Sequence, residues 1–333
     1  AGGTDPLISG IPTVQRIVRK TPPEELTHAE QVTFEIRFSK PVLGLTEDNL
    51  TLVTGGAQSG ATIASVGSEE DGRVWTVVVE TVPGADGTIR LDLDRNLSSI
   101  SDTWDPPNVL ELPFTTGEVY LVDRVVPEIL AITRNDPALP ETNATQVMFA
   151  VTFSETVKGL GVDSFSIDGT GAQSSATVAL IDGNADTWLV TVATEPGDGE
   201  LSVDLDAGLP ELTDAAGNSV VTPFIDGEGY HIDRTAPTVT GIARHMPSQE
   251  KTDATTVSFQ VSFTEPVTGV TAENFRIDGD GAQEGAFITG VAGGGDTWTV
   301  NVTTAGGDDR LSIDLDNVTG ISDAAGNVLG QPF

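Results

Sequence analysis

The sequence predicts an all-β protein built from three tandem antiparallel β-sandwiches, and three observations support this fold class. Tryptophans recur after 113 and 110 residues, at Trp75, Trp188 and Trp298. A Gly-Ala-Gln motif precedes each of them at a similar distance. Apolar and polar residues alternate along short segments, which is the pattern of a strand with one buried face. A repeat of about 110 residues matches the length of one sandwich domain.

These repeats divide the chain into four segments. They are a lead-in (residues 1–13), repeat 1 (14–126), repeat 2 (127–236) and repeat 3 (237–333). Repeat 3 stops at Phe333, which aligns with Phe224 of repeat 2, so its final strand is missing. Two interpretations stay open: a fragment cut from a longer array, or an open edge that takes a strand from a neighbouring subunit.

Short strands are expected in each repeat, separated by Gly, Pro, Asp and Asn. The clearest alternation covers residues 32–38, 147–153 and 257–263. In repeat 2 we expect strands near residues 128–133, 146–154, 164–168, 176–181, 187–193, 200–206 and 228–232. Seven strands with a turn about every ten residues indicate an immunoglobulin-like sandwich. The connections are too short for helical crossovers, which favours antiparallel pairing. We expect the three sandwiches to form an elongated rod.

Composition narrows the function classes. The chain has 50 acidic and 16 basic residues and a net charge of −34, which disfavours binding to nucleic acid or to an anionic membrane. No cysteine is present, so there is no thiol nucleophile, disulfide or Cys-ligated zinc site. The sequence has no apolar run of membrane-spanning length. We expect a secreted, extracellular protein of the cell surface, with no direct membrane insertion and no enzymatic activity.

An acidic set of residues is expected at the end where the chain enters each sandwich. If the strands alternate in direction, Glu155 at a strand end lies beside Asp214 and Asn218 of a later turn, and Asp123 arrives from the linker. The equivalent residues of repeat 3 are Asp233, Glu265, Asp323 and Asn327. The preceding repeat faces the same joint with Asp86 or Asp198. Carboxylates, an amide and backbone carbonyls suit calcium, which takes six to eight oxygen ligands.

Two alternatives stay open for these residues. Asp-Ala-Ala-Gly-Asn is also good tight-turn chemistry without a metal, and an ion could bridge two repeats or lie within one. Repeat 1 differs: Lys40 stands where the glutamates stand, and Ser9-Gly10 replaces the Asp-Arg of the linkers. The turn of residues 101–108 also interrupts the acid-to-Asn spacing. We therefore expect no equivalent metal site in repeat 1.

Four motifs resemble the tandem bacterial Ig-like domains of large secreted, calcium-dependent adhesins, including Bap-like and RTX-type biofilm surface proteins. They are DRTAP at Asp233–Pro237, FSETV at Phe153–Val157, FTEPV at Phe263–Val267 and DAAGN at Asp214–Asn218 and Asp323–Asn327. The resemblance covers repeats 2 and 3 well and repeat 1 weakly. It implies spacer domains that calcium stiffens at or near the joints. It implies that calcium is bound by Asp123, Glu155, Asp214, Asn218, Asp233, Glu265, Asp323 and Asn327, and that repeat 1 has no such ligands.

These observations favour a non-enzymatic extender segment of a bacterial cell-surface adhesin or matrix protein, with calcium at the joints. Its partners are neighbouring repeats of the same or an adjacent chain. The alternative is a self-assembling extracellular filament or surface-layer subunit that uses strand exchange at the incomplete third repeat. A carbohydrate-binding module would need exposed aromatic residues on one face, and most aromatics of this chain fall at core positions of the alternation.

Overall fold

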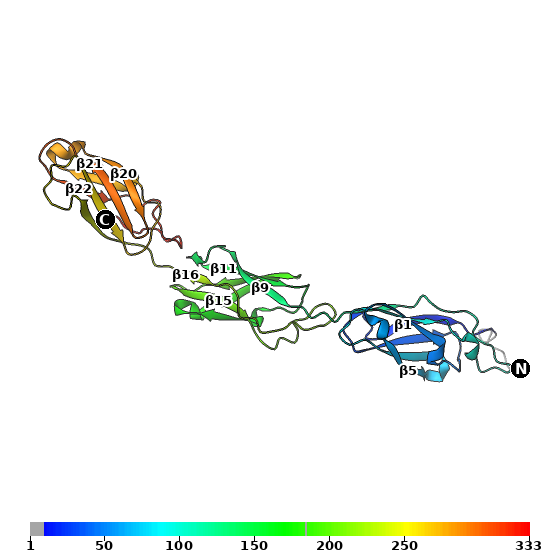
Figure 1. The fold of residues 1–333 in the computed structure, drawn as a ribbon. Helices are drawn as coiled ribbons and strands as arrows, with labels where there is room; N and C mark the ends of the chain where they lie inside the picture. Colours follow the sequence, from blue (N-terminus) through cyan, green and yellow to red (C-terminus); the bar gives the residue numbers. More distant parts are fainter. Residues whose placement is uncertain (1–9, 184) are drawn as a thin grey trace.

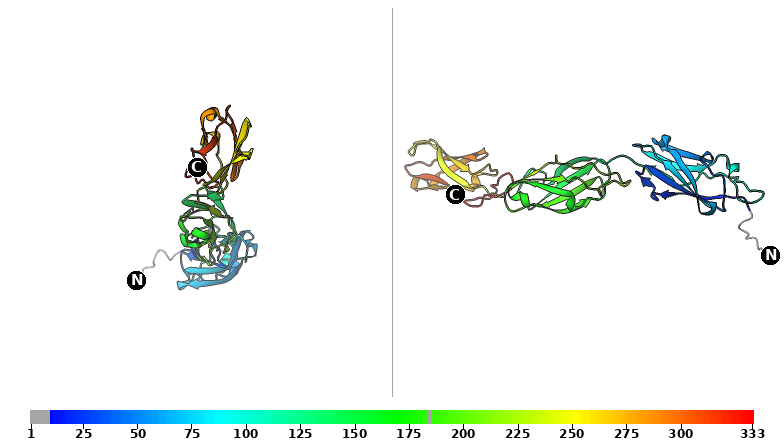
Figure 2. Two further views of the ribbon diagram at one scale, coloured as in Figure 1. Left: turned by 90° about the vertical axis from the view of Figure 1, so that its left-hand side faces the viewer. Right: turned by 90° about the horizontal axis from the view of Figure 1, so that it is seen from below.

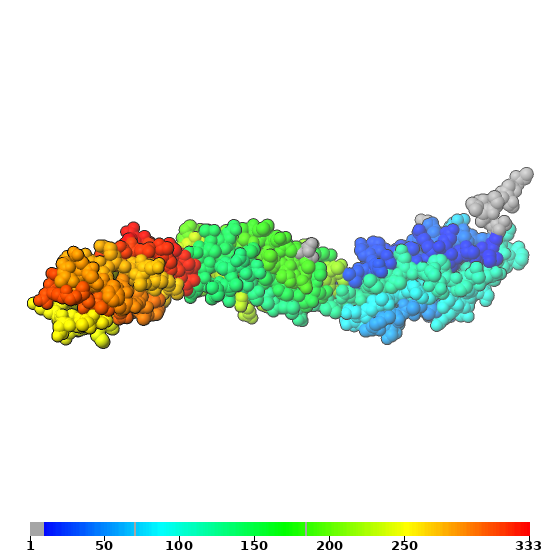
Figure 3. Space-filling model, turned by 90° about the horizontal axis from the view of Figure 1, so that it is seen from above, coloured from blue at the N-terminus to red at the C-terminus, as the bar shows by residue number. Residues whose placement is uncertain are grey.

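The computed structural model describes residues 10–183 and 185–333, and it is elongated (Figure 1 and Figure 2). The three repeats follow one another along its length, from repeat 1 in blue and cyan to repeat 3 in yellow, orange and red (Figure 3). Regular structure in the described residues consists of strands and short 3-10 turns, so the protein is all-β as predicted. The turns are η1 Glu47–Asn49, η2 Gln58–Gly60, η3 Glu70–Gly72, η4 Leu97–Ser99, η5 Val162–Ser164, η6 Gly171–Ser175, η7 Ala272–Asn274 and η8 Gly281–Gly285.

Repeat 1 forms two four-stranded sheets. The first has the order β1 (Val14–Thr21), β3 (Gln31–Phe38), β6 (Val74–Glu80) and β5 (Thr62–Glu69). The second has the order β2 (Leu26–Thr27), β8 (Val119–Val122), β7 (Gly87–Leu93) and β4 (Leu50–Gly56). Leaving aside the short β2, this is the strand arrangement of a seven-stranded immunoglobulin sandwich.

Repeat 2 has the same two four-stranded sheets. They are β9 (Ile129–Asp136), β11 (Gln146–Phe153), β14 (Thr187–Ala193) and β13 (Thr177–Gly183), and then β10 (Glu141–Thr142), β16 (Tyr230–Ile232), β15 (Gly199–Leu205) and β12 (Phe165–Gly169). All seven strands expected in repeat 2 are present. The short strand β10 was not expected, and it pairs in parallel with β16, as β2 pairs with β8. The antiparallel prediction therefore holds for every other pair in these two repeats.

Repeat 3 keeps one complete sheet and only part of the other. The complete sheet is β17 (Val239–Met246), β18 (Thr256–Phe263), β21 (Thr297–Thr303) and β20 (Phe287–Gly294). The second consists of β19 (Phe275–Gly279) and β22 (Leu311–Leu315). No described segment stands where β8 and β16 lie in the other repeats, as expected for a repeat without its final strand.

Each repeat has its own apolar core. The period-two residues of β3, β11 and β18 point into these cores, and three clusters of buried side chains form between the paired sheets. Burying one such aliphatic or aromatic side chain contributes about 1.5–3 kcal/mol. Trp75 and Trp188 are buried, and their indole nitrogens donate to nearby backbone carbonyls. These two tryptophans are therefore core residues, as the alternation predicts.

Candidate metal centres

Three carboxylates from separate segments meet at the joint between repeats 1 and 2. Asp123 lies in the linker directly after β8, Glu155 follows the end of β11, and Asp214 lies in the turn after β15. One oxygen of each carboxylate lies within 4.8 Å of the other two. The antiparallel order of the strands returns these loops to one end of the sandwich, which is the reason that residues so far apart in sequence become neighbours.

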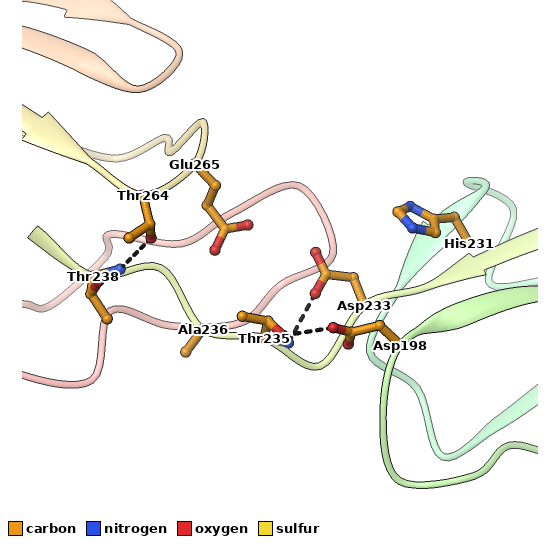
Figure 4. A pocket seen from close by; sticks show the side chains of 8 residues that line it. All are labelled: Asp198, His231, Asp233, Thr235, Ala236, Thr238, Thr264 and Glu265. Atoms are coloured by element: carbon orange, nitrogen blue, oxygen red, sulfur yellow. Dashed lines mark hydrogen bonds between the residues drawn. The ribbon is translucent and has the colours of Figure 1, made fainter. Parts of the chain in front are cut away.

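The joint between repeats 2 and 3 has the equivalent cluster. Asp233, Glu265 and Asp323 also offer oxygens within 4.8 Å of one another. Figure 4 shows the carboxylates of Glu265 and Asp233 pointing toward each other at a hollow of about 450 Å³. Asp198 and His231 of repeat 2 line the same hollow. The cluster therefore has room beside it for a cation with water ligands.

Asp214 closes its own turn in addition to joining the first cluster. Its Oδ1 accepts hydrogen bonds from the backbone amides of Gly217 (2.7 Å) and Asn218 (2.9 Å), and its Oδ2 accepts one from Asn218 Nδ2 (2.8 Å). Asp323 makes the same contacts with Gly326 and Asn327. Both aspartates therefore make the local hydrogen bonds expected of a tight turn. A carboxylate has about four acceptor positions, so these three bonds leave one free for a further ligand.

Asn218 and Asn327 hold the linker against the turn. Asn218 Nδ2 donates to the carbonyl oxygen of Asp123 at 3.1 Å, and Asn327 Nδ2 donates to that of Asp233 at 2.9 Å. The two asparagines thus position the linker aspartate next to the turn aspartate. Direct ligation of a metal by their amide oxygens stays a prediction.

Glu155 has no partner for one of its buried oxygens. Among the described residues no donor lies within hydrogen-bond distance of Glu155 Oε1, although that atom is shielded from solvent. A buried acceptor left without a donor costs about 1–3 kcal/mol, and more when it is charged. A cation in the cluster would satisfy this oxygen.

The electrostatics of the clusters also favour a cation. Burial raises the pKa of Glu155, and the charges of Asp214 and Asp123 raise it further. Burial and the charge of Asp214 likewise raise the pKa of Asp123. At the second joint burial raises the pKa of Glu265, with Asp233 and Asp323 adding to the effect. Burial is the larger cause of the raised pKa values, and like charges at close range add to it, because each carboxylate disfavours ionisation of its neighbours.

An arginine fixes each linker to the repeat that precedes it. Arg124 Nη2 donates to the carbonyl oxygen of Ala29 at 2.8 Å and lies 2.6 Å from Thr81 Oγ1. The backbone amide of Arg124 donates to Asp86 Oδ1 at 2.6 Å. Arg234 repeats these contacts with Ala144, Thr194 and Asp198. Asp86 and Asp198 therefore lie at the joints as expected, where they bind the linker backbone.

Contacts between consecutive repeats add to this attachment. His28 Nδ1 lies 2.6 Å from the carbonyl oxygen of Ala216 in the turn of repeat 2. At the second joint the backbone amide of Asn143 donates to Ala325 O at 3.1 Å, and Asn143 Nδ2 donates to Asn327 Oδ1 at 3.0 Å. The sequence analysis missed these contacts and the arginine contacts. The recurring signals were Thr-x-Ala, which begins at the last residue of β2 and of β10, and Asp-Arg in both linkers.

In repeat 1 a lysine occupies the place of the missing glutamate. Lys40 Nζ lies 2.9 Å from Asp102 Oδ2 and also donates to the carbonyl oxygen of Gly10. Both side chains of the pair are buried, with 6% and 1% of their surface exposed. Ser9 lies outside the described residues.

The turn after β7 has the longer acid-to-Asn spacing noted in the sequence, yet it keeps the contacts of the shorter turns. Asn108 donates through its backbone amide to Asp102 Oδ1 and through Nδ2 to Asp102 Oδ2, both at 2.8 Å. These are the contacts of Asn218 with Asp214, although here the two residues are six rather than four positions apart. The extra residues bulge outward and leave the aspartate and the asparagine in register.

Comparison with known proteins identifies no family. No protein-family model matches the chain, and no curated protein matches it significantly. Among the described residues no helix is long and apolar enough to cross a lipid bilayer.

Several solved structures are similar at low identity. Domains 1–6 of the surface layer protein SbsC share 13% identity with a TM-score of 0.23, over 97% of this chain and 59% of that chain. Invasin, a bacterial integrin-binding protein, shares 11% with a TM-score of 0.38, over 92% and 57%. The S-layer protein rSbsC(31-844) shares 13% with a TM-score of 0.24, over 96% and 58%. The chain thus spans between 57% and 59% of the length of these structures, and likeness at this level carries no functional argument.

Proposed function

We propose that this chain is a non-enzymatic extender segment of a bacterial cell-surface adhesin or matrix protein, stiffened by calcium at its two joints. One observation carries the proposal. At each joint one carboxylate comes from the linker and two come from the following repeat, and their oxygens converge within 4.8 Å. The resemblance of the DRTAP and DAAGN motifs to calcium-dependent adhesins agrees with it.

The donor set suits calcium better than the other common divalent cations. Calcium binds oxygen at about 2.3–2.6 Å, so two ligands of one ion lie no more than about 5 Å apart, which the clusters satisfy. Three carboxylates on flexible loop ends leave positions for water or backbone carbonyls, as calcium requires. Magnesium demands near-octahedral geometry and keeps several waters, while zinc prefers nitrogen and sulfur ligands.

Repeat 1 supports this assignment through its chemistry. The same position beside the turn aspartate is filled there by the ammonium of Lys40, at 2.9 Å from Asp102 Oδ2. In repeat 1 a fixed positive charge, the Lys40 ammonium, stands beside the turn aspartate. In repeats 2 and 3 that position holds the glutamate of the three-carboxylate cluster. Each turn aspartate is therefore matched with one positive species, a lysine in repeat 1 and a bound cation in the other two.

Stiffening follows from how the linker is held. Arg124 attaches the linker to repeat 1 and Asp123, one residue earlier, belongs to the cluster of repeat 2. A cation on the cluster would bind Asp123 to Glu155 and Asp214 and remove their mutual repulsion. The linker would then be anchored on both sides within two residues. A rod with anchored joints holds whatever it carries at a fixed distance from the cell.

The remaining assignments belong to the same proposal. The protein is secreted and lies at the cell surface, and its partners are neighbouring repeats of the same or an adjacent chain. The net charge of −34 argues against nucleic acid and anionic membranes as partners.

Calcium titration of the chain tests the proposal. Isothermal titration calorimetry should give two sites, and Glu155→Gln and Glu265→Gln should each remove one of them. Small-angle X-ray scattering should give a longer and less variable particle in calcium than in EDTA. Thermal unfolding curves and scattering curves that are identical in calcium and in EDTA would refute calcium stiffening.

A second candidate function is a filament or surface-layer subunit that assembles by strand exchange. The edge of β22, which lacks a pairing strand before Leu315, favours it. Light scattering over a range of protein concentrations separates the two, because the extender stays monomeric and the subunit forms oligomers that grow with concentration.

A further inference from the structure

The second sheet of repeat 3 lacks two strands that the other repeats have, the short parallel strand (β2, β10) and the final strand (β8, β16). In repeats 1 and 2 the strands β8 and β16 complete the second sheet. In repeat 3 that sheet ends at β22, which begins at Leu311. The equivalent strand β15 begins at Gly199 and pairs there with β16, so β22 is shorter where a partner is lacking.

The absent strand leaves apolar core residues partly uncovered. In repeat 2 the ring of Tyr230 packs edge-on against Phe149 with 5.1 Å between ring centroids, and both are fully buried. The equivalent Phe259 has 8% of its surface exposed and no aromatic partner among the described residues. Leu311 is half-buried, whereas its counterpart Leu201 is buried. The surface that a final strand would cover, along the edge of β22 and over Phe259, is referred to as the groove.

Polar acceptors for the tyrosine are retained in the groove. The Tyr230 hydroxyl lies 2.7 Å from the carbonyl oxygen of Pro137 and 3.0 Å from that of Met148. Tyr120 makes the same pair of contacts in repeat 1, with Pro22 and Thr33. Repeat 3 has Pro247 and Ser258 at these positions. A tyrosine entering the groove would find both acceptors and the face of the core.

The binding site for the linker arginine is also retained. In repeat 3 Thr304 Oγ1 donates to Ala254 O at 3.1 Å. Thr194 and Thr81 make this bond with Ala144 and Ala29 at the places where Arg234 and Arg124 bind. Asp308 occupies the position of Asp198, which accepts the amide of the linker arginine. The loop that carries Ala254 lies at the end of the molecule farthest from repeat 2, in yellow in Figure 3.

Arg244 completes the set of contacts. Its counterpart Arg134 donates through its backbone amide to Glu228 Oε2 at 2.8 Å and through Nη1 to Gly229 O at 2.9 Å. Arg19 repeats both contacts with Glu118 and Val119 in repeat 1. Arg244 is exposed in repeat 3. Residues that hold the final strand in two repeats are thus all present in the third.

We propose that this groove binds a closing strand of the same type as β8 and β16, supplied by a further stretch of chain. The occupant has the form Gly-Glu-x-Tyr-x-(Val/Ile)-Asp-Arg, which is shared by residues 117–124 and 227–234. The groove is defined by Ile242, Arg244, Phe259, Thr304, Asp308 and Leu311. The inference is independent of calcium, because none of these residues belongs to a carboxylate cluster.

The chemistry of the groove selects this occupant over an arbitrary strand. Backbone pairing with β22 accepts any extended segment, so specificity comes from the side chains. The tyrosine fills the uncovered surface over Phe259, the glutamate meets the Arg244 amide, and the arginine reaches Ala254 and Thr304. These three contacts have the same spacing in both occupied repeats.

A labelled peptide that copies residues 226–237 tests the inference. Fluorescence anisotropy with the 333-residue chain in EDTA should show one site per chain. Replacing the peptide tyrosine by alanine should weaken binding about a hundredfold, since a large buried aromatic surface is lost. Arg244→Ala in the chain should weaken it about fivefold. Arg16→Ala is the matched control, because Arg16 is exposed on β1 of repeat 1, where it pairs with Glu35, and this variant should bind the peptide like the unaltered chain.

Two results would overturn the inference. The first is affinity for the native peptide no greater than for a scrambled one. The second is equal binding by the Arg244→Ala and Arg16→Ala variants, which would place the peptide elsewhere. Because the assay contains EDTA, a negative result here leaves the calcium proposal untouched, and failure of the calcium titration leaves this assay unaffected.

Discussion

The ammonium of Lys40 lies 2.9 Å from Oδ2 of Asp102 in repeat 1, where repeats 2 and 3 place a glutamate beside the corresponding aspartate. Burial by itself raises the pKa of Asp102, but hydrogen bonds from Asn108, Lys40 and the Trp104 amide outweigh it and lower the pKa to about 2. Lys40 thus neutralises the Asp102 carboxylate, so this end of repeat 1 needs no metal ion.

Replacing Lys40 by methionine should destabilise repeat 1 whether or not calcium is present. The variant leaves the Asp102 carboxylate buried without its charged partner, which costs about 3–5 kcal/mol. Urea unfolding followed by tryptophan fluorescence measures the effect. Lys20→Met is the control, because Lys20 forms an exposed pair with Glu69 that contributes about 0–1 kcal/mol. Equal effects of both variants would show that the buried pair has no special weight.

Introducing a lysine at Glu155 should make the first joint independent of calcium. Glu155→Lys recreates the Lys40–Asp102 arrangement beside Asp214 and removes a proposed ligand at the same time. Calorimetry should then count one calcium site instead of two, and the site at Glu265 should keep its affinity. Retention of two sites would mean that Glu155 is not a ligand.

Acidification should act in opposite directions with and without calcium. The folded-state pKa values of Glu155, Asp123 and Glu265 are raised, so the folded chain binds more protons than the unfolded chain in the range just above the ordinary glutamate value of 4.5. In EDTA, stability should therefore rise as the pH falls from neutrality into that range. In excess calcium it should fall, because protons displace the ion.

Differential scanning calorimetry at several pH values measures this dependence. The double variant Glu155→Gln with Glu265→Gln should lose most of the rise seen in EDTA. A rise of the same size in the double variant would assign it to other carboxylates of this acidic chain.

Removing the linker arginine should loosen the first joint without unfolding either repeat. Arg124→Ala deletes the contacts with Ala29 and Thr81, and hydrogen bonds to a charged group contribute about 1.5–3 kcal/mol. Distances between spin labels on repeats 1 and 2 should spread over a wider range. Arg234→Ala should affect only the second joint. A distance distribution unchanged by Arg124→Ala would exclude the arginine as a joint element.

Two glycines in equivalent turns provide a matched pair. Gly217 and Gly326 have φ of +100° and +95°, so alanine costs each turn roughly 1–2 kcal/mol of backbone strain. A Cβ on Gly217 would lie 2.6 Å from His28 Cε1, whereas one on Gly326 would lie 3.7 Å from Asn143 Nδ2. Gly217→Ala should therefore also displace His28 and widen the distances between repeats 1 and 2. The same label measurement on Gly326→Ala should show a smaller change at the second joint, and equal changes would exclude the clash.

Sequence alone predicted the seven main strands of repeat 2 and the acidic residues placed near the joints. The alternation in 147–153 and its counterparts reports a half-buried strand, because neighbouring side chains of a strand point to opposite faces. The recurrence of Glu155 and Asp214 in repeat 3 as Glu265 and Asp323 marked both as candidates for one site. Local periodicity and repetition are properties of the residue order itself, so both could be recognised without coordinates.

Tertiary structure decided which of these groups meet. Lys40 and Asp102 are 62 positions apart, and Arg124 and Ala29 are 95 apart. The turn with Asp102 and Asn108 keeps the geometry of its shorter counterparts, since an insertion can bulge outward without moving its ends. Contacts of this kind depend on where several loops end in space. Strand pairing and core packing set those positions, and the spacing of residues along the chain does not.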